Sequence, residues 1–452
     1  MSWTLPEILG ATGGELLRWG AGPFRSFSTD SRTLLPDEVF VALRGPHFDG
    51  REFLADASRR GASAAITSSD ELFGPAAIVR VEDSLRALGD LAAAHRRRLP
   101  VRVVGITGSN GKTTTKEMIA AVLAASGACV AKTRGTENNL VGLPQTLLRL
   151  SGCEDFAVLE MGMNHPGEIW RLAEIARPDV GVITNVGPAH LESLGTLENV
   201  AAAKEELALA LPTHATLVVN GADPRLVAIG ERCPRHTIVV GERVRAVGSS
   251  ATATGQFLEI EVDGRREPVE ITMRGAHNVQ NALLTVATGI ALGIDLEVAL
   301  DGLRRFTPPP MRLEVVDLPS GARILNDAYN ANPASMRAAL AALAAEPGRR
   351  RIAVLGEMWE LGEGAGRYHR EVGHAAGTLR IDRLVAVGRH ADQVVEGAIE
   401  GGLRDEAVER AASTAEASER LAGCLGEGDV VLVKGSRGAH MEDIVQTLRS
   451  RG

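Results

Sequence analysis

A glycine-rich segment at residues 105–115 has the residue types that hold the phosphates of a nucleotide. It reads GITGSNGKTTT, follows the apolar, β-branched residues 101–104 and precedes residues 116–125, whose composition is helical. Backbone N–H groups of such a loop surround phosphate oxygens, and the helix N-terminus adds a favourable dipole. Lys112 would place its charge at the β- and γ-phosphates, and the Thr113 hydroxyl could ligate Mg²⁺. The order of strand, loop and helix predicts a nucleotide site. Its expected cradle is Gly108, Ser109, Asn110, Gly111, Lys112, Thr113 and Thr114.

Lysine is rare in this chain. Lysine and arginine together number 49, and the lysines are Lys112, Lys116, Lys132, Lys204 and Lys434. Where only a positive charge is needed the chain uses arginine, so each lysine raises the question of whether an ammonium that can lose its proton is required there. The alternative is a GC-rich genome that retains a few lysines. That alternative explains Lys132 well and the phosphate-loop Lys112 poorly.

Polar residues follow two further expected strands of the same region. The strand at 156–159 leads to Glu160, and the strand at 180–184 leads to His190. Open α/β sheets bind ligands at the carboxyl ends of their strands, so both side chains could lie beside the phosphate loop and bind Mg²⁺. Carboxylate is a natural ligand for this ion and imidazole is less usual. A solvated charge at a strand end is the alternative for Glu160, and a structural role is an equal alternative for His190.

Three other positions combine a plain structural interpretation with a functional one. Lys204 lies in an Ala-rich helical segment, where a lone lysine is normally solvated. Asn278 is a plausible N-cap of a helix, and Asn281, one turn on, could bond to an adenine edge. Arg312 follows a proline-rich break and could reach phosphate from the next domain.

Polar residues also gather at expected strand ends in the C-terminal third and near the N-terminus. Residues 326–333 (NDAYNANP) suit either a site or ordinary turn and cap chemistry. A second such segment is GEMWELGE at 356–363. Residues 433–438 place Lys, Ser and Arg around two glycines, which would suit a carboxylate or a phosphate. Residues 28–32 (STDSR) offer hydroxyls and an arginine, and a simple turn explains them equally well.

Alternating strand and helix patterns predict an α/β protein of three domains. Residues 1–98 predict a small α/β domain that ends in a basic run and a proline at 96–100. Residues 99–307 predict a central P-loop domain with a parallel sheet, and the prolines at 308–310 form a stiff break. Residues 308–452 predict a Rossmann-like domain. The strands expected are 39–43, 63–68, 76–81, 101–106, 156–160, 180–184, 216–219, a hairpin turning at 263–264, and 322–326, 351–355, 383–387 and 429–433.

Composition excludes several classes of protein. The hydrophobic and charged contents, 44% and 23%, are ordinary for a globular chain, and no segment is long and apolar enough to span a membrane. The first ten residues lack the basic and apolar pattern of a secretory signal, and the four cysteines lack metal-ligand spacing, so we expect a cytoplasmic protein with reduced thiols. A net charge of −8 argues against bulk nucleic-acid binding but permits anionic small substrates. We expect a monomer.

Taken in order, these motifs resemble the Mur ligases, the ATP-dependent amide ligases of peptidoglycan precursor synthesis, over essentially the whole chain. Five residues separate Gly105 from Gly111, one more than in the standard P-loop, and the phosphate loop of this family accounts for the difference. Within the family the chain most resembles the branch that adds D-alanyl-D-alanine. The segments that carry this similarity are 28–32, 160–164, 327–333, 356–362 and 434–438. The diaminopimelate-adding branch would carry an Asp-Asn-Pro-Arg motif, which this sequence lacks.

The resemblance implies a reaction. The terminal carboxylate of UDP-N-acetylmuramoyl-tripeptide attacks the γ-phosphate of ATP, and the amine of D-alanyl-D-alanine attacks the resulting acyl phosphate, giving an amide, ADP and phosphate. Thr113 and Glu160 would hold one Mg²⁺, and His190 would help to hold a second. Lys204 would be carbamylated by CO₂, which requires a neutral amine and gives an anion able to ligate or support Mg²⁺.

The resemblance also assigns binding roles. Asn281 would contact adenine, and Arg312 and Asp327 would close over ATP about a hinge near 306–311. The UDP-sugar would be held by Ser28, Thr29, Asp30, Ser31 and Arg32. Further substrate contacts would come from Asn138, Asn139, Asn330, Asn332, Lys434, Ser436 and Arg437. The third residue of the acceptor peptide, meso-diaminopimelate or lysine, is not encoded in any motif.

Two alternatives belong to other branches or classes. Folylpolyglutamate synthase shares the phosphate loop and the mechanism but lacks a UDP-sugar domain like residues 1–98. A P-loop nucleotide switch would hydrolyse its nucleotide without an acceptor, and it would need neither the third domain nor Lys204.

Overall fold

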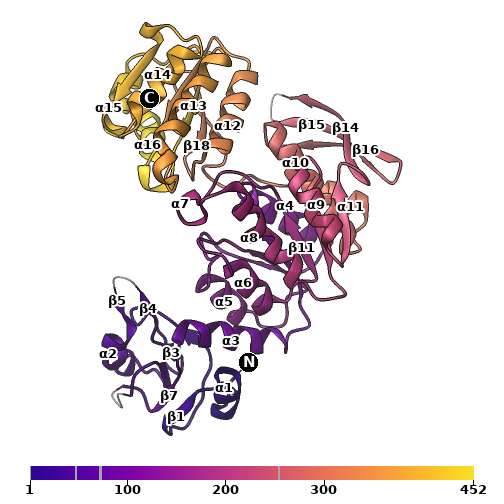
Figure 1. Cartoon of the computed structure of the whole chain (residues 1–452), viewed down its shortest axis with the longest axis vertical. Coiled ribbons are helices and arrows are strands. Elements are labelled where there is room, and N and C mark those ends of the chain that lie inside the picture. The colour runs from indigo at the N-terminus through magenta and orange to yellow at the C-terminus, as the bar shows by residue number, and fades with distance from the viewer. Residues whose placement is uncertain (1, 46–47, 71–73, 253–254, 452) are drawn as a thin grey trace.

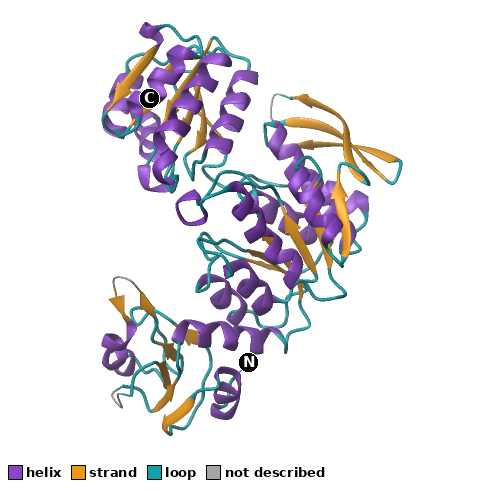
Figure 2. Cartoon of the chain, viewed as in Figure 1, coloured by secondary structure: helices purple, strands orange, loops and turns teal. Residues whose placement is uncertain are grey.

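Three α/β domains follow one another along the long axis of the molecule in the computed structural model (Figure 1). The structure describes residues 2–45, 48–70, 74–252 and 255–451. Each domain has its own sheet with helices packed against it (Figure 2), which confirms the predicted fold class. None of the helices within these ranges is long and apolar enough to cross a membrane. The domain boundaries at 98 and 307 stay predictions.

The N-terminal domain is built on a five-stranded sheet in the order β1-β7-β6-β3-β2. The three apolar segments predicted as strands form its buried centre, β3, β6 and β7. Helix α3 begins at the N-cap Asp83 and packs against α5 and α6 of the central domain, so it joins the two domains. The elements are α1 (Leu5–Thr12), β1 (Glu15–Arg18), β2 (Phe27–Ser28), β3 (Val39–Val41), β4 (Arg44–Gly45), β5 (Phe48–Asp49), α2 (Leu54–Arg59), β6 (Ala64–Thr67), β7 (Ala77–Arg80) and α3 (Ser84–Arg96).

The central domain has nine strands in the order β16-β15-β14-β13-β12-β11-β8-β10-β9. Strand β8, which leads into the phosphate loop, lies between β10 and β11 in the parallel part. Strands β14 to β16 are antiparallel and project from the domain (Figure 1), with the predicted hairpin as β15 and β16. Its first elements are β8 (Arg102–Thr107), α4 (Lys112–Ala125), β9 (Val130–Lys132), α5 (Gly142–Leu148), β10 (Phe156–Glu160), α6 (Glu168–Ala176), β11 (Val180–Ile183), α7 (Leu191–Leu194) and α8 (Leu197–Ala210). The others are β12 (Thr216–Asn220), α9 (Pro224–Arg232), β13 (His236–Val240), β14 (Val244–Ala251), β15 (Gln256–Val262), β16 (Arg265–Ile271), α10 (Ala276–Ala291) and α11 (Leu296–Arg304).

The C-terminal domain has six strands in the order β17-β18-β22-β19-β20-β21, all parallel except β17. The four predicted strands are β18, β19, β20 and β22, and the two edge strands β17 and β21 were not predicted. The elements are β17 (Glu314–Asp317), β18 (Arg323–Asp327), α12 (Pro333–Ala345), β19 (Arg350–Leu355), α13 (Ala365–Thr378), β20 (Arg383–Val387), α14 (Ala391–Glu400), β21 (Val408–Ala411), α15 (Thr414–Ala422), β22 (Asp429–Lys434) and α16 (Glu442–Arg451).

A buried ion pair joins the central and C-terminal domains. Arg274, just before α10, places its Nε 2.6 Å from Oε1 of Glu346, which ends α12, and the two side chains are 11% and 6% exposed. Burial raises the pKa of Glu346, and the charge of Arg274 opposes that shift. The contact between the two domains therefore includes a buried carboxylate that is stable in its ionised form only beside the Arg274 guanidinium.

Replacing Arg274 by Met is expected to destabilise the protein by about 3 kcal/mol near pH 8 and by less near pH 5. A pKa of Glu346 that is higher in the folded than in the unfolded chain means that stability falls as pH rises through the folded value. Calorimetric unfolding at the two pH values measures the effect. Arg305→Met is the control, because the Arg305–Asp301 pair is exposed and contributes little. An equal loss at both pH values would contradict the prediction.

Candidate active site

The phosphate loop needs glycine at two positions. Gly108 and Gly111 have φ angles of +148° and +79°. A Cβ atom at Gly108 would lie 1.9 Å from the Thr184 hydroxyl, and one at Gly111 would lie 2.6 Å from Oδ1 of Asn281. Both positions therefore require the absence of a side chain as well as the unusual backbone. The Ser109 hydroxyl donates to the Gly187 carbonyl at 3.0 Å, and this hydrogen bond ties the loop to the segment that follows β11.

Lys112 lies at the phosphate loop, as predicted from the sequence. Its Nζ donates to the Gly108 carbonyl at 2.7 Å, across the hollow of the loop. Burial lowers the pKa of Lys112, while the nearby Glu160 raises it. Among the residues that the structure describes, the ammonium has the Gly108 carbonyl as its hydrogen-bond partner, so donors remain for an incoming phosphate oxygen.

Glu160 is buried at the end of β10, only 3% exposed, which rules out the solvated strand-end alternative. Its Oε2 accepts from the Thr113 hydroxyl at 2.9 Å, and its Oε1 accepts from Nδ2 of Asn138 at 3.0 Å. Strand pairing of β10 with β8 brings the residue beside the loop, as the sequence predicts. Two hard oxygen donors thus converge at one point, the donor set that Mg²⁺ prefers.

Lys204 is 1% exposed on α8, so the expectation of a solvated helical lysine is wrong. Burial lowers its pKa well below the ordinary value, and the charge of Lys112 lowers it further. Its ammonium forms no hydrogen bond or ion pair with any residue that the structure describes. The arrangement favours a neutral amine, the form of lysine that reacts with CO₂.

His190 lies at the start of α7 with a φ of +56°, and it reaches toward the C-terminal domain. Its Nδ1 lies 2.8 Å from Oε2 of Glu360, in the segment after β19. This hydrogen bond lowers the pKa of Glu360. The imidazole therefore has one nitrogen bonded across the domain boundary in this conformation.

Arg312 crosses the same boundary in the other direction. Its Nη2 donates to the Thr113 hydroxyl at 3.1 Å, and its guanidinium lies 4.1 Å from the centre of the Tyr329 ring. Met311 and Leu313 on either side have positive φ angles, so the backbone is strained at this point. The Nε of Arg312 is buried without a partner among the described residues, which leaves a donor for a ligand.

Asn281 is buried against the loop, and Asn278 does not cap the helix as the sequence suggested. Helix α10 begins at Ala276 with Gly275 as N-cap, which places Asn278 inside the first turn. Asn278 donates to the Arg274 carbonyl at 2.7 Å and accepts from Nδ2 of Asn281 at 2.9 Å. The contact of Asn281 with adenine stays a prediction.

Several predicted substrate residues of the C-terminal domain are already bonded within the protein. Nζ of Lys434 is 2.6 Å from Oδ2 of Asp327 and 2.9 Å from the Asn330 carbonyl. Asn332 caps α12 in a reciprocal pair with Ser335, and its Nδ2 also donates to Oδ1 of Asn110 at 2.6 Å. The Asn332 amide thus joins the cap of α12 to the phosphate loop.

Ser436 and Arg437 differ in their exposure. The Ser436 hydroxyl is buried, donates to the Ala331 carbonyl and accepts from the Trp359 N–H at 3.0 Å, so it fixes three strand ends together. Arg437 is exposed and pairs with Glu442 at 2.6 Å. Their contacts with a dipeptide stay predictions.

The predicted UDP-sugar segment lies at the face of the N-terminal domain that meets the central domain. Ser28 and Asp30 form the turn that the sequence left as an alternative, with the Ser28 hydroxyl 3.1 Å from the Asp30 carbonyl. Thr29 accepts a hydrogen bond from Nε2 of Gln145 at 2.5 Å, across the two domains. Ser31 is buried, and Arg32 pairs with Asp30.

Asn139 has a local structural role. Its Oδ1 accepts from the N–H groups of Val141 and Gly142 at the start of α5.

Three Mur ligase domains match this chain. They are the Mur ligase family catalytic domain at 24–102, the middle domain at 106–289 and the glutamate ligase domain at 311–437. The UDP-N-acetylmuramoyl-tripeptide–D-alanyl-D-alanine ligase of Bacillus subtilis is 36% identical over 93% of this chain and 92% of its own. The chain belongs to the Mur ligase family.

Solved Mur ligases agree with this fold over its length. MurF from Acinetobacter baumannii has a TM-score of 0.93 and 31% identity over 100% of this chain and 99% of its own. MurF from Thermotoga maritima, solved in complex with ADP, has a TM-score of 0.86 and 30% identity over 94% and 97% of the two chains.

One group of this Mur ligase was missed by sequence reasoning. Glu357 accepts hydrogen bonds from the N–H and Nδ1 of His390, both at 2.7 Å, and the ring of His369 stacks on His390 at 4.4 Å. His369 cannot readily give a lone pair to a metal, because its Nε2 accepts from the Met358 N–H at 2.9 Å and its Nδ1 contacts the Ala365 carbonyl. The group instead fixes the segment after β19.

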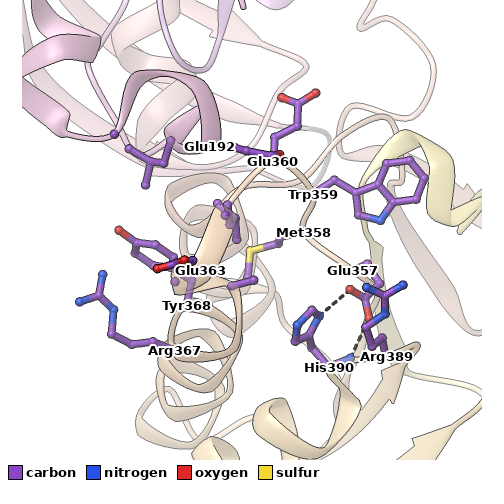
Figure 3. Close-up of a pocket in the computed structure, with 16 residues that line it drawn as sticks. Glu192, Glu357, Met358, Trp359, Glu360, Glu363, Arg367, Tyr368, Arg389 and His390 are labelled. Atoms are coloured by element: carbon purple, nitrogen blue, oxygen red, sulfur yellow. Dashed lines mark hydrogen bonds and ion pairs between the residues drawn. The ribbon is translucent and has the colours of Figure 1, made fainter.

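This segment forms one wall of a pocket of about 1180 Å³ between α7 and the C-terminal domain. Figure 3 shows Glu192 and Glu360 on one side and Arg389 and His390 on the other. The pocket borders Glu360, the partner of His190. The segment at 356–363 was singled out in the sequence, but no signal linked it to Arg389, which follows a different strand.

Proposed function

We propose that this Mur ligase joins D-alanyl-D-alanine to UDP-N-acetylmuramoyl-tripeptide, with cleavage of ATP to ADP and phosphate. The main support is full-length similarity to ligases of that name, together with a phosphate loop whose Lys112 and Thr113 lie beside Glu160 at the end of β10. The T. maritima relative binds ADP, which supports ATP as the nucleotide here. The reaction takes place in the cytoplasm, where ATP is supplied, and the enzyme acts as a monomer.

The residues of the phosphate loop explain how the tripeptide carboxylate can be activated. Two anions must approach each other when the carboxylate attacks the γ-phosphate of ATP. Lys112 neutralises charge on the phosphoryl oxygens, and the free Nε of Arg312 offers a second donor from the C-terminal domain. Thr113 and Glu160 would hold Mg²⁺, which supplies further charge neutralisation when bound.

Lys204 fits the role of a carbamylated lysine. Its amine is buried and its pKa is lowered well below the ordinary value, which favours the neutral form of the nitrogen that attacks CO₂. The product would carry a negative charge that attracts the nearby ammonium of Lys112. Lysine in a chain that otherwise uses arginine is explained by this need for a neutral amine.

We infer that the dipeptide enters the pocket beside α7, with its carboxylate on Arg389. Lys434 and Ser436 are bonded within the protein, whereas Arg389 makes no hydrogen bond or ion pair within the described ranges. The acidic side of the pocket, Glu192 and Glu360, would attract the ammonium group of the dipeptide.

Replacing Arg389 by Ala is expected to raise KM for D-alanyl-D-alanine about 10- to 100-fold, the value of one charge-assisted contact. D-Alanyl-D-alaninamide lacks the carboxylate, so wild type and variant should use it equally poorly. Arg367→Ala is the control, since Arg367 lies over Tyr368 in the same pocket. Steady-state ADP release measures both substrates. A penalty that is the same with the amide would contradict the assignment.

The proposed function is tested by ADP release with four combinations of substrates. ATP and Mg²⁺ are supplied with the UDP-tripeptide, with D-alanyl-D-alanine, with both and with neither. Release that needs both substrates is expected. Release without either would indicate a nucleotide switch, and turnover only with tetrahydrofolate and glutamate would indicate a folylpolyglutamate synthase.

A further inference from the structure

Lys116 is a lysine that the reaction described above does not use. It lies one turn beyond Lys112 on α4, is 1% exposed and is among the largest fully buried side chains. Its Nζ donates to the Thr133 carbonyl at 2.8 Å and lies 3.1 Å from Oε1 of Glu117. Burying an ammonium group is costly unless its partners compensate, so this lysine needs an explanation.

The partners of Lys116 also hold the Glu160 strand end. Nζ of Lys116 lies 4.0 Å from Oε2 of Glu160, the oxygen that accepts from the Thr113 hydroxyl. The Thr133 hydroxyl accepts from the Glu160 N–H at 2.7 Å and donates to the Val158 carbonyl at 3.3 Å. Thr133 therefore holds the backbone of Glu160, and Lys116 places a positive charge beside its carboxylate.

The charges form a row from the surface to the phosphate loop. Lys132, which is exposed, pairs with Glu117, and Glu117 pairs with Lys116. Lys116 faces Glu160, which bonds to Thr113. Positive and negative groups alternate along the row, so the buried members compensate one another.

We propose that Lys116 is a positioning residue that holds Glu160 ready to bind the divalent cation of the nucleotide. A compact ammonium can bond to the Thr133 carbonyl and pair with Glu117 while its charge lies 4.0 Å from the Glu160 carboxylate, whereas a planar guanidinium needs more room. In this proposal Lys116 acts through Glu160 and not through the nucleotide itself. The inference rests on the proposed function only in requiring a metal–nucleotide site, so it can be tested without ligation.

The test measures the affinity for Mn²⁺ in the presence of ADP. The electron paramagnetic resonance signal of free Mn²⁺ reports how much of the ion is bound. Lys116→Met keeps an unbranched side chain of similar length without the charge. We expect it to weaken Mn²⁺ binding about 10-fold, as loss of a residue that orients a metal ligand commonly does. Lys132→Met, at the exposed end of the row, is the matched control and should change the affinity less than twofold.

The direction in which Mn²⁺ affinity changes distinguishes a positioning role of Lys116 from simple charge repulsion of the metal. A cation that only repels the metal would, when removed, make Mn²⁺ bind more tightly. Tighter or unchanged binding by Lys116→Met therefore overturns the proposal. ADP affinity without metal should stay unchanged, and in ligation KM for Mg²⁺ should rise while kcat at saturating Mg²⁺ is retained within a few fold.

A second variant covers the case in which Lys116→Met does not fold. Thr133→Val keeps the shape and the carbonyl but removes the hydroxyl that holds the Glu160 N–H. It is expected to weaken Mn²⁺ binding in the same direction, by about 3-fold or more. Wild-type Mn²⁺ affinity in Thr133→Val would then contradict the proposal. If the wild-type protein shows no ligation, the proposed function is refuted. If Lys116→Met and Thr133→Val both bind Mn²⁺ as the wild type does, this inference is refuted as well.

Discussion

Replacing Lys112 by Met lowers kcat/KM for ligation by about 1000-fold in this account. Lys112 is the cation inside the phosphate loop, with its Nζ held across the hollow by the Gly108 carbonyl. Its charge matters most when the phosphoryl oxygens gain charge in the transition state, so kcat should fall more than ATP affinity. Single-turnover and steady-state rates with both substrates measure the two effects.

The thermal stability of Lys112→Met serves as the control for loss of folding. The pKa of Lys112 is lowered by burial, so the folded chain binds fewer protons there than the unfolded chain, and stability rises with pH through that range. Removing the ammonium should therefore leave the melting temperature unchanged or higher, with the larger gain at low pH. A variant that retains more than one tenth of the wild-type kcat/KM would contradict the role given to Lys112.

Replacing Lys204 by Arg, the residue nearest to it in size and polarity, is expected to lower kcat about 1000-fold. A guanidinium cannot lose its proton in a protein and cannot form a carbamate. It would also place a permanent cation near Lys112, where the wild-type amine has its pKa lowered. Initial rates of ADP release with both substrates measure the loss.

The wild-type enzyme provides the companion measurement. In buffer depleted of CO₂ its activity should decline, and bicarbonate should restore it, while Lys204→Arg should respond to neither change. Short carboxylic acids are expected to restore part of the activity of Lys204→Ala, because they can replace the missing anion. Full activity of Lys204→Arg would contradict the carbamate role given to this residue.

Much of the fold was predictable because buried parallel strands are continuous apolar runs. Strands β8, β10, β11 and β12 read as such runs, and each was predicted within a residue or two. Two of the missed strands, β9 and β14, lack this signal, whereas β13 (HTIVV) has it and was also missed. Strand β9 has only three residues, and β14 (VRAVGSSA) is largely polar and exposed at the antiparallel end of the sheet. Pairing with neighbours, which a local pattern does not contain, makes these segments strands.

The site was predictable where one segment carries its own chemistry. The phosphate loop is contiguous, and Glu160 follows from the rule that ligands bind at the carboxyl ends of parallel strands. Contacts between distant segments were not predictable. His190 meets Glu360, and Asn332 meets Asn110, more than 150 residues away in each pair. The burial of Lys204 was not predicted, because a lone lysine in an Ala-rich helix is normally solvated, although Val200 and Leu207 lie on the same buried face of α8.

The measurement that tests the central claim most directly follows oxygen from the substrate carboxylate. UDP-N-acetylmuramoyl-tripeptide carrying ¹⁸O at both terminal carboxylate oxygens is incubated with ATP, Mg²⁺ and D-alanyl-D-alanine, and both products are analysed by mass spectrometry. Activation through an acyl phosphate predicts one ¹⁸O in the released phosphate and one in the new amide carbonyl of the pentapeptide product. Unlabelled phosphate, or phosphate formed without the pentapeptide, would contradict the account.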